Sequence, residues 1–265
     1  MVALAELQGV GSPPALIHAI ESHLVGCFGA TGSTDPILGD LPEFNATFPR
    51  ARDRPTLRVV HGPDPTIPKW WWVASGARAT ERTSPPESFG YALHHRERGM
   101  AVGIRTAHQR TLMPRWSLVH AVKTPEDRQW VVDLWTRARP VGNPTAAADL
   151  AEWLAAAALR EPESRRVLLA WSGGRPVATV ATRRSDDVVG VYGLCVLPEM
   201  RHAGLGRALL AAALRRSEYD GANWAVTIAR VEDEPFYVDF GFAPYCDFDV
   251  YRREAAPAGS ISAPV

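Results

Sequence analysis

Arg-His-Ala-Gly-Leu-Gly at residues 201–206 is the stretch from which the fold is inferred. It follows an apolar run at 188–196 and opens an Ala/Leu-rich run at 208–214, which predicts a strand, a glycine loop and a helix in succession. Glycines let a backbone approach an anion closely, and a helix start directs free N–H groups toward it. The spacing matches neither Gly-x-Gly-x-x-Gly nor Gly-x-x-x-x-Gly-Lys-Ser/Thr, so it does not indicate the common dinucleotide or nucleoside-triphosphate sites.

Composition sets the broad class of the protein. A chain of 265 residues, 46% of them apolar, can hold one large domain or two small ones around a real core. Lys plus Arg equal Asp plus Glu, 29 against 29, so no basic field predicts nucleic-acid binding. The three cysteines, Cys27, Cys195 and Cys246, are too far apart for a disulfide framework or a Cys-x-x-Cys metal site. With no basic N-terminal region and no membrane-length apolar run, a cytoplasmic protein is expected.

The second half of the chain has clear start and stop signals. Thr124-Pro-Glu-Asp predicts a capped helix, because Thr suits the N-cap and Pro the first helical position. Ser172-Gly-Gly-Arg between two apolar runs predicts a hairpin. The expected order is strand, two helices, three strands, helix, strand, helix, strand. The remaining expected elements are a strand at 116–122, a helix from Asn143-Pro144, the strand at 188–196, a helix to about Ser217, a strand at 224–229, a helix at 233–239 and a strand at 242–252.

The first 115 residues are less patterned. We expect a helix at 12–26, short strands at 44–48 and 57–61, and a strand at 70–74. A helix at 84–98 and a strand at 100–106 complete this half. Residues 255–265 are expected to form a flexible tail.

Three segments together resemble the GCN5-related N-acetyltransferase (GNAT) family. They are the Leu-Cys-Val-Leu-Pro-Glu and Arg-x-x-Gly-x-Gly run at 194–206, the Gly-Gly hairpin, and Phe-Tyr-Val-Asp-Phe-Gly-Phe at 236–242. The resemblance covers residues 116–254 and implies an α/β fold with a mixed sheet and a catalytic domain over that range. Residues 1–115 resemble the truncated, degenerate GNAT-like half-domain of bi-modular members. That half lacks a second glycine loop, so one CoA site is implied.

The resemblance also implies roles for individual residues. The loop would offer N–H groups to the CoA pyrophosphate, and the preceding strand would pair with the pantetheine arm and polarise the thioester carbonyl. His202 stands where the family often has Gly. The residues implied in binding acetyl-CoA are Leu194, Cys195, Val196, Arg201, His202, Ala203, Gly204, Leu205, Gly206 and Arg207.

Tyr237 has two interpretations. In the family, tyrosine at this place protonates the departing thiolate, a role that the similar pKa values of phenol and thiol permit. The alternative is a core aromatic beside Phe236, Phe240 and Phe242. Cys195 likewise is a core residue or an acyl-accepting nucleophile.

The general base is left unnamed. The strand before the loop has no glutamate, although many family members place one there. The candidates are Glu199, Asp186, Asp187 or a water. Of these, Glu199 is interpreted as structural and the two aspartates as turn residues.

Two further clusters carry open interpretations. The His-His-Arg-Glu-Arg run at 94–98 is interpreted as a solvated helix face, and no metal site is predicted because His-x-x-x-His spacing is absent. Trp70, Trp71 and Trp72 would line an acceptor pocket or pack between the two halves. Exposed tryptophans would suit a homodimer, which is left open.

The resulting hypothesis is an acetyl-CoA-dependent N-acetyltransferase that moves an acetyl group to an amine of a small molecule or peptide. The alternatives are an acyl-CoA-binding protein without transfer activity, an enzyme of the same fold using another acyl-CoA or another CoA reaction, and a protein-interaction module. Neutral overall charge does not identify the acceptor.

Overall fold

The computed structural model describes residues 46–47, 70–74, 87, 90–108, 118–138 and 144–253. The chain divides into two compact units, each described here by itself. Unit 1 comprises Met1–Cys27 and Arg98–Tyr245, and unit 2 comprises Phe28–Glu97 and Cys246–Val265. The expected helix at 12–26, strand at 57–61 and tail at 255–265 lie outside the described residues, and the expected domain boundaries stay predictions.

The elements follow one another closely along the second half of the chain. In chain order they are β1 (Ala46–Thr47), β2 (Trp70–Ala74), β3 (Tyr91–Gly103), α2 (Ile104–His108), β4 (Leu118–Ala121), α3 (Pro125–Ala138), α4 (Pro144–Arg160), β5 (Arg165–Ser172), β6 (Arg175–Ser185), β7 (Val188–Val196), η3 (Pro198–Met200), α5 (Leu205–Tyr219), β8 (Trp224–Arg230), η4 (Val231–Asp233), α6 (Glu234–Phe240) and β9 (Ala243–Arg253). From β4 onward this order is the one expected from the sequence.

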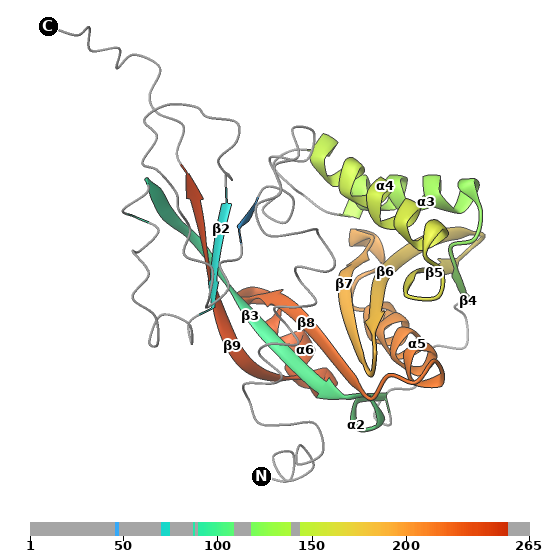
Figure 1. Ribbon diagram of the computed structural model, residues 1–265. Helices are drawn as coiled ribbons and strands as arrows, with labels where there is room; N and C mark the ends of the chain where they lie inside the picture. The colour runs from blue at the N-terminus through green and yellow to red at the C-terminus, as the bar shows by residue number, and fades with distance from the viewer. Residues whose placement is uncertain are drawn as a thin grey trace, which may run out of the picture. The chain divides into compact units, whose positions relative to one another are not determined.

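Unit 1 is built on a mixed sheet, as the sequence predicts. Its strands lie in the order β3-β8-β7-β6-β5-β4 (Figure 1). Strands β4 to β7 are antiparallel neighbours, whereas β7 and β8 run parallel because α5 crosses between them. The predicted α/β fold class with a mixed sheet is therefore confirmed.

Helices cover both faces of this sheet. Consecutive residues of a strand point to opposite faces of the sheet. On β5, Arg165 pairs with Glu161, just after the end of α4, whereas Arg166 pairs with Asp220 at the C-cap of α5. Arg165 Nε lies 2.9 Å from a carboxylate oxygen of Glu161, just after α4. Helices α4 and α5 therefore lie on opposite faces, as Figure 1 shows, with α3 beside α4.

The predicted start of α3 is confirmed in detail. The Asp127 N–H donates to Thr124 Oγ1 at 3.1 Å, and the Thr124 N–H donates to Asp127 Oδ2 at 3.1 Å. This reciprocal pair is a capping box, with Asp in the place that Glu or Gln usually takes. It orients α3 directly after β4.

The predicted β5–β6 hairpin is also present. Gly173 and Gly174 have φ angles of +59° and +76°, and they connect Ser172 to its cross-strand partner Arg175. Two consecutive residues with positive φ match a two-residue turn of type I′, whose twist suits a hairpin.

Unit 2 contains the short strands of the N-terminal half. Strand β1 pairs with β2 in parallel, β2 pairs with β9 antiparallel, and β9 neighbours β3. The predicted strand at 70–74 is confirmed, and the one expected at 44–48 is the shorter Ala46–Thr47. Arg96 Nε donates to Asp249 Oδ1 at 2.8 Å, which compensates a carboxylate in a residue only 5% exposed.

The expected helix at 84–98 is wrong. Residues 91–103 form the long strand β3, and the strand expected to run to 106 gives way to α2 at Ile104. His, Arg and Glu, the residue types of the run at 94–98, are acceptable in a helix, so the local sequence was compatible with the predicted helix. Pairing overrides that preference, because β3 has a neighbouring strand on each side in the sheet order, β9 and β8.

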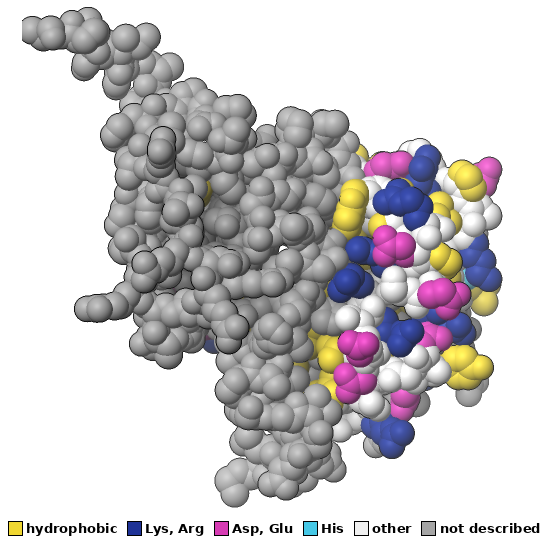
Figure 2. Space-filling view, in the orientation of Figure 1, with side chains coloured by type: hydrophobic (Ala, Val, Ile, Leu, Met, Phe, Trp, Pro, Cys, Tyr) yellow, Lys and Arg dark blue, Asp and Glu magenta, His cyan; other side chains and the backbone are white. Residues whose placement is uncertain are grey.

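The described surface carries charges of both signs. Figure 2 shows Lys and Arg side chains interspersed with Asp and Glu on the coloured face. This agrees with the equal numbers of acidic and basic residues in the sequence. Among the helices that the structure describes, none is both long enough and apolar enough to span a membrane.

Candidate active site

Strand β7 separates from its parallel neighbour partway along its length. The two strands pair from Val188–Trp224 to Val191–Thr227, whereas β7 continues to Val196 and β8 to Arg230. The Thr227 hydroxyl donates to the Val191 carbonyl at 3.0 Å, at the last paired position. Beyond it, the described pairing with β8 stops while β7 continues to Val196, a geometry that suits strand-like addition of an extended ligand.

A β-bulge accompanies this separation. Thr179 and Ala181 of β6 pair with Cys195 and Tyr192 of β7, so β7 carries one extra residue between these pairs. Gly193 lies in this segment with φ +58°, which favours glycine. A Cβ there would overlap the indole of Trp135, with Cη2 at 2.9 Å. The bulge was not expected from the sequence, although glycine inside an apolar strand is its usual signal.

The glycine loop leads directly into the N-terminus of α5. Gly204 is the N-cap with φ +79° and no side-chain cap. The first N–H groups of an α-helix have no intrahelical partner, so those of α5 remain donors for an anion. His202 also has positive φ, +62°, and stands in the left-handed region that favours glycine. This donor set fits a pyrophosphate, the group that the sequence predicts here.

Two arginines hold the loop in place. The Arg201 guanidinium donates to the carbonyls of Val196 at 3.2 Å and Ala138 at 2.8 Å. The backbone N–H of Arg201 donates to the Pro198 carbonyl. Arg207 donates to the Asp239 carbonyl at 2.7 Å. The structure thus shows both side chains anchoring neighbouring elements, and their direct contact with a ligand stays a prediction.

Helix α6 lies beside the start of α5. A Cβ on Gly206 would be 3.5 Å from a Val196 methyl and 3.7 Å from the Phe236 ring, which are ordinary contacts. Tyr237 is 8% exposed and meets Phe236 and Phe242 edge to face, at centroid distances of 5.1 and 5.5 Å. These aromatic surroundings suit the interpretation of Tyr237 as a core residue. They also place its phenol next to the Phe236 ring, which in turn lies beside Gly206. The proton-donor role stays a prediction.

Cys195 and Glu199, two further candidates for a catalytic role, make contacts within the fold. Cys195 is buried and faces Thr179 across the β6–β7 pair. Glu199 is exposed and bridges Arg137 at 3.2 Å and Arg175 at 3.5 Å, in accord with a structural role.

Asp186 and Asp187 form the β6–β7 turn, at the opposite end of β7 from the glycine loop. Asp186 has φ +52°, and the Asp187 carbonyl accepts N–H groups from Asn223 and Trp224. These contacts favour the interpretation of both as turn residues.

The histidine run lies on β3 rather than on a helix. His94 Nδ1 and His95 Nδ1 are 2.7 Å apart, and His95 Nε2 lies 3.1 Å from Glu97 Oε1. The part of the chain that the structure describes contains no group of three or more His, Cys, Asp or Glu arranged to hold a metal. Trp70, Trp71 and Trp72 lie on β2, paired with β9, and their proposed roles stay predictions.

Comparison with known proteins adds a family match. Residues 128–242 match the family model described as Acetyltransferase (GNAT) family. No curated protein sequence matches the chain significantly.

Solved structures share the fold at low sequence identity. A functionally unknown conserved protein from Staphylococcus epidermidis aligns with a TM-score of 0.55 and 14% identity, over 71% of this chain and 73% of that one. A GCN5-related N-acetyltransferase from Kribbella flavida aligns with a TM-score of 0.52 and 19% identity, over 71% and 68%. A tandem GNAT protein from the clavulanic acid biosynthesis pathway aligns with a TM-score of 0.50 and 14% identity, over 71% and 64%.

The family match spans the two-helix pair, the separated strand, the glycine loop and the tyrosine-bearing helix. It supports an acyltransferase activity. Residues 128–242 of this chain thus match the GNAT acetyltransferases, and unit 1 has the mixed α/β fold of the solved GNAT structures.

Proposed function

We propose that this protein transfers an acetyl group from acetyl-CoA to a primary amine. The observation that carries the proposal is the separation of β7 from β8 after Val191, followed by a glycine loop whose helix start has no side-chain cap. An extended edge suits the pantetheine arm, and a helix N-terminus reached through Gly204 suits the pyrophosphate. Both lie inside the region that matches the GNAT family.

The proposed reaction is direct attack. The amine nitrogen, delivered neutral, bonds to the thioester carbonyl carbon, and the C–S bond breaks. Backbone N–H groups at 194–196 stabilise the oxyanion that forms on the carbonyl oxygen. Tyr237 donates its phenolic proton to the departing sulfur, and the proton released by the amine passes to solvent, from which the phenolate regains a proton. No carboxylate is assigned as base, because Glu199 is paired with two arginines.

Calorimetric titration with acetyl-CoA tests the binding half of the proposal. Wild-type protein is expected to bind in the micromolar range, and Gly206→Asp is expected to lose binding because it adds negative charge where phosphate would lie. A Cβ at this position has ordinary van der Waals room, so the fold should tolerate the change. Gly206→Asn adds the same bulk without charge and should bind at least about tenfold more tightly than the Asp variant. Equal, undiminished binding by both variants would contradict the loop assignment.

CoA release with a panel of amines tests the transfer half. Tyr237→Phe keeps the ring contacts with Phe236 and Phe242 but removes the proton, so kcat should fall about 100-fold with unchanged acetyl-CoA affinity. Unchanged turnover would leave Tyr237 as a core aromatic. Binding of acetyl-CoA with no CoA release for any amine would instead support an acyl-CoA-binding protein.

A further inference from the structure

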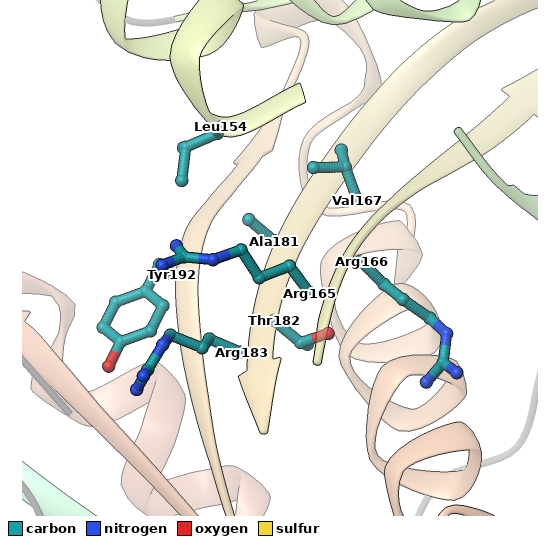
Figure 3. Close-up of a pocket in the computed structure, with 8 residues that line it drawn as sticks. All are labelled: Leu154, Arg165, Arg166, Val167, Ala181, Thr182, Arg183 and Tyr192. Carbon is teal, nitrogen blue, oxygen red and sulfur yellow. The ribbon is translucent and has the colours of Figure 1, made fainter. Parts of the chain in front are cut away.

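A small pocket lies on the α4 face of the sheet, apart from the glycine loop. Its polar lining consists of Arg165, Arg166, Thr182, Arg183 and Tyr192, and its apolar lining of Leu154, Val167 and Ala181 (Figure 3). The pocket is small and open to solvent, so it has room for a single small group rather than for a whole substrate.

Two arginines face each other across this pocket. Arg165 of β5 and Arg183 of β6 are direct cross-strand partners, so their side chains leave the same face of the sheet. In Figure 3 both reach toward Tyr192, whereas Arg166 points away toward α5. Like charges directly opposite on neighbouring strands repel each other, so this arrangement needs a compensating negative charge.

Only one of the two charges is compensated. Arg165 donates to Glu161 at 2.9 Å and its guanidinium lies 5.3 Å from the Trp153 ring centroid. This hydrogen bond lowers the pKa of the Glu161 carboxyl, so the carboxyl stays ionised at neutral pH. The half-buried Arg183 forms no side-chain hydrogen bond or ion pair with the described residues. Within the part of the chain that the structure describes, the positive charge of Arg183 is therefore left uncompensated in the pocket.

A phenol lies beside that charge. Gly190 is the cross-strand partner of Arg183, and the Tyr192 ring folds back over it. A Cβ on Gly190 would lie 2.6 Å from ring carbons of Tyr192, so only glycine admits the ring in this position. Gly190 thereby keeps the Tyr192 hydroxyl next to the Arg183 guanidinium (Figure 3).

One guanidinium and one hydroxyl above an apolar wall suit a monoanion of planar shape. A carboxylate can accept two parallel N–H bonds from the Arg183 fork and a further bond from a phenol. The single charge of Arg183 favours a carboxylate over a dianionic phosphate.

The pocket also lies at the point where β7 and β8 separate. Tyr192 is the first residue of β7 beyond the last pair with β8, at the point where the strands separate. Val196, which leads to the glycine loop, is six residues from Gly190 or about 20 Å along an extended strand. An anion in the pocket is therefore distinct from the pyrophosphate at α5.

We propose that this pocket binds the carboxylate of the acceptor, which makes the acceptor an amino acid or another amine that carries a carboxylate. This inference rests on the proposed acetyl transfer for its second half, because only then is the bound anion an acceptor. The anion site itself depends on Arg183 and Tyr192 alone.

A binding experiment tests the pocket without any catalysis. N-acetyl-glycine, -alanine, -leucine and -phenylalanine are titrated by NMR into the full-length protein, each beside its C-terminal amide. At least one acid is expected to bind at least about tenfold more tightly than its amide, the contribution of a charged hydrogen-bonded pair. Arg183→Gln should abolish this preference, and Arg183→Lys should restore part of it.

The matched control is Arg105→Gln. It removes the same charge from a side chain that is 81% exposed on α2, paired with Glu218, and should leave the preference intact. A wild type with no preference for the acids, or an Arg183→Gln variant that retains it, overturns the pocket assignment. Circular dichroism melts of all variants show whether a loss reflects unfolding.

The activity arm separates this inference from the proposed function. CoA release is measured with free amino acids and with their amides. Acid-selective binding without CoA release refutes acetyl transfer and leaves the anion site standing. CoA release with equal kcat/KM for acids and amides refutes the carboxylate pocket and leaves acetyl transfer standing.

Discussion

Gly193 shows how much one residue of β7 determines. It combines a positive φ with direct packing under Trp135, a side chain only 2% exposed. The bulge that it permits shifts the register with β6 between Tyr192 and Cys195, next to residues 194–196, whose edge is proposed to bind pantetheine. A residue that cannot adopt this φ would straighten the strand or displace the indole.

We therefore predict that Gly193→Ala lowers the free energy of unfolding by about 3 kcal/mol, from backbone strain and overlap with Trp135. Gly173→Ala is the matched control, because Gly173 has nearly the same φ, +59°, but no atom within 4 Å of its Cβ position. It should cost only about 1 kcal/mol. Chemical denaturation of both variants measures the difference. Equal losses would mean that Trp135 moves aside without cost.

At the scale of elements, the start of α3 is set by residues close to it in the sequence. Thr124 and Asp127 exchange hydrogen bonds at its start, and Val131, Leu134, Trp135 and Ala138 supply its buried face. Every hydrogen bond of the cap lies within four residues, which is why the sequence pattern located this helix. Strand β3 is the opposite case, since its conformation depends on neighbours more than 100 residues away in the chain.

We expect Thr124→Ala to destabilise the protein by about 1 kcal/mol, since it leaves the Asp127 N–H without its cap. Thr136→Ala is the control within the same helix, where the exposed hydroxyl only donates to the Val132 carbonyl. Because alanine favours helix, that change should be neutral or slightly stabilising. Thermal and urea unfolding measure the free energy of unfolding of both variants. A Thr124 variant as stable as the wild type would show that tertiary packing alone sets the start of α3.

At the scale of the whole molecule, the two helical layers of unit 1 are joined to the sheet by ion pairs on both faces. Arg165 binds Glu161 on the α4 face, and Arg166 binds Asp220 on the α5 face. The second pair is the more enclosed, with side chains 21% and 14% exposed. Removing one partner there leaves a partly buried charge without compensation.

Asp220→Asn is accordingly predicted to lower the free energy of unfolding by about 2 kcal/mol. Glu152→Gln serves as the control, because its partner Arg128 lies at 3.1 Å but both side chains are more than 40% exposed. Its effect should be under about 0.5 kcal/mol. Denaturation at low and high salt distinguishes the two, since a buried pair is screened less than an exposed one. A strongly salt-sensitive loss in Asp220→Asn would contradict the enclosed pair.

The sequence by itself determined the capped start of α3, the Gly-Gly hairpin, the glycine loop before α5 and the tyrosine on α6. Each of these depends on residues within one turn or one hairpin, so local propensity and pattern were sufficient. Tertiary structure alone decided the conformation of β3, the bulge at Gly193 and the separation of β7 from β8. It alone also brought Arg183 opposite Arg165 and beside Tyr192. These features follow from which strands pair and in which register, and most of those partners are far apart in the chain, beyond the reach of local propensity.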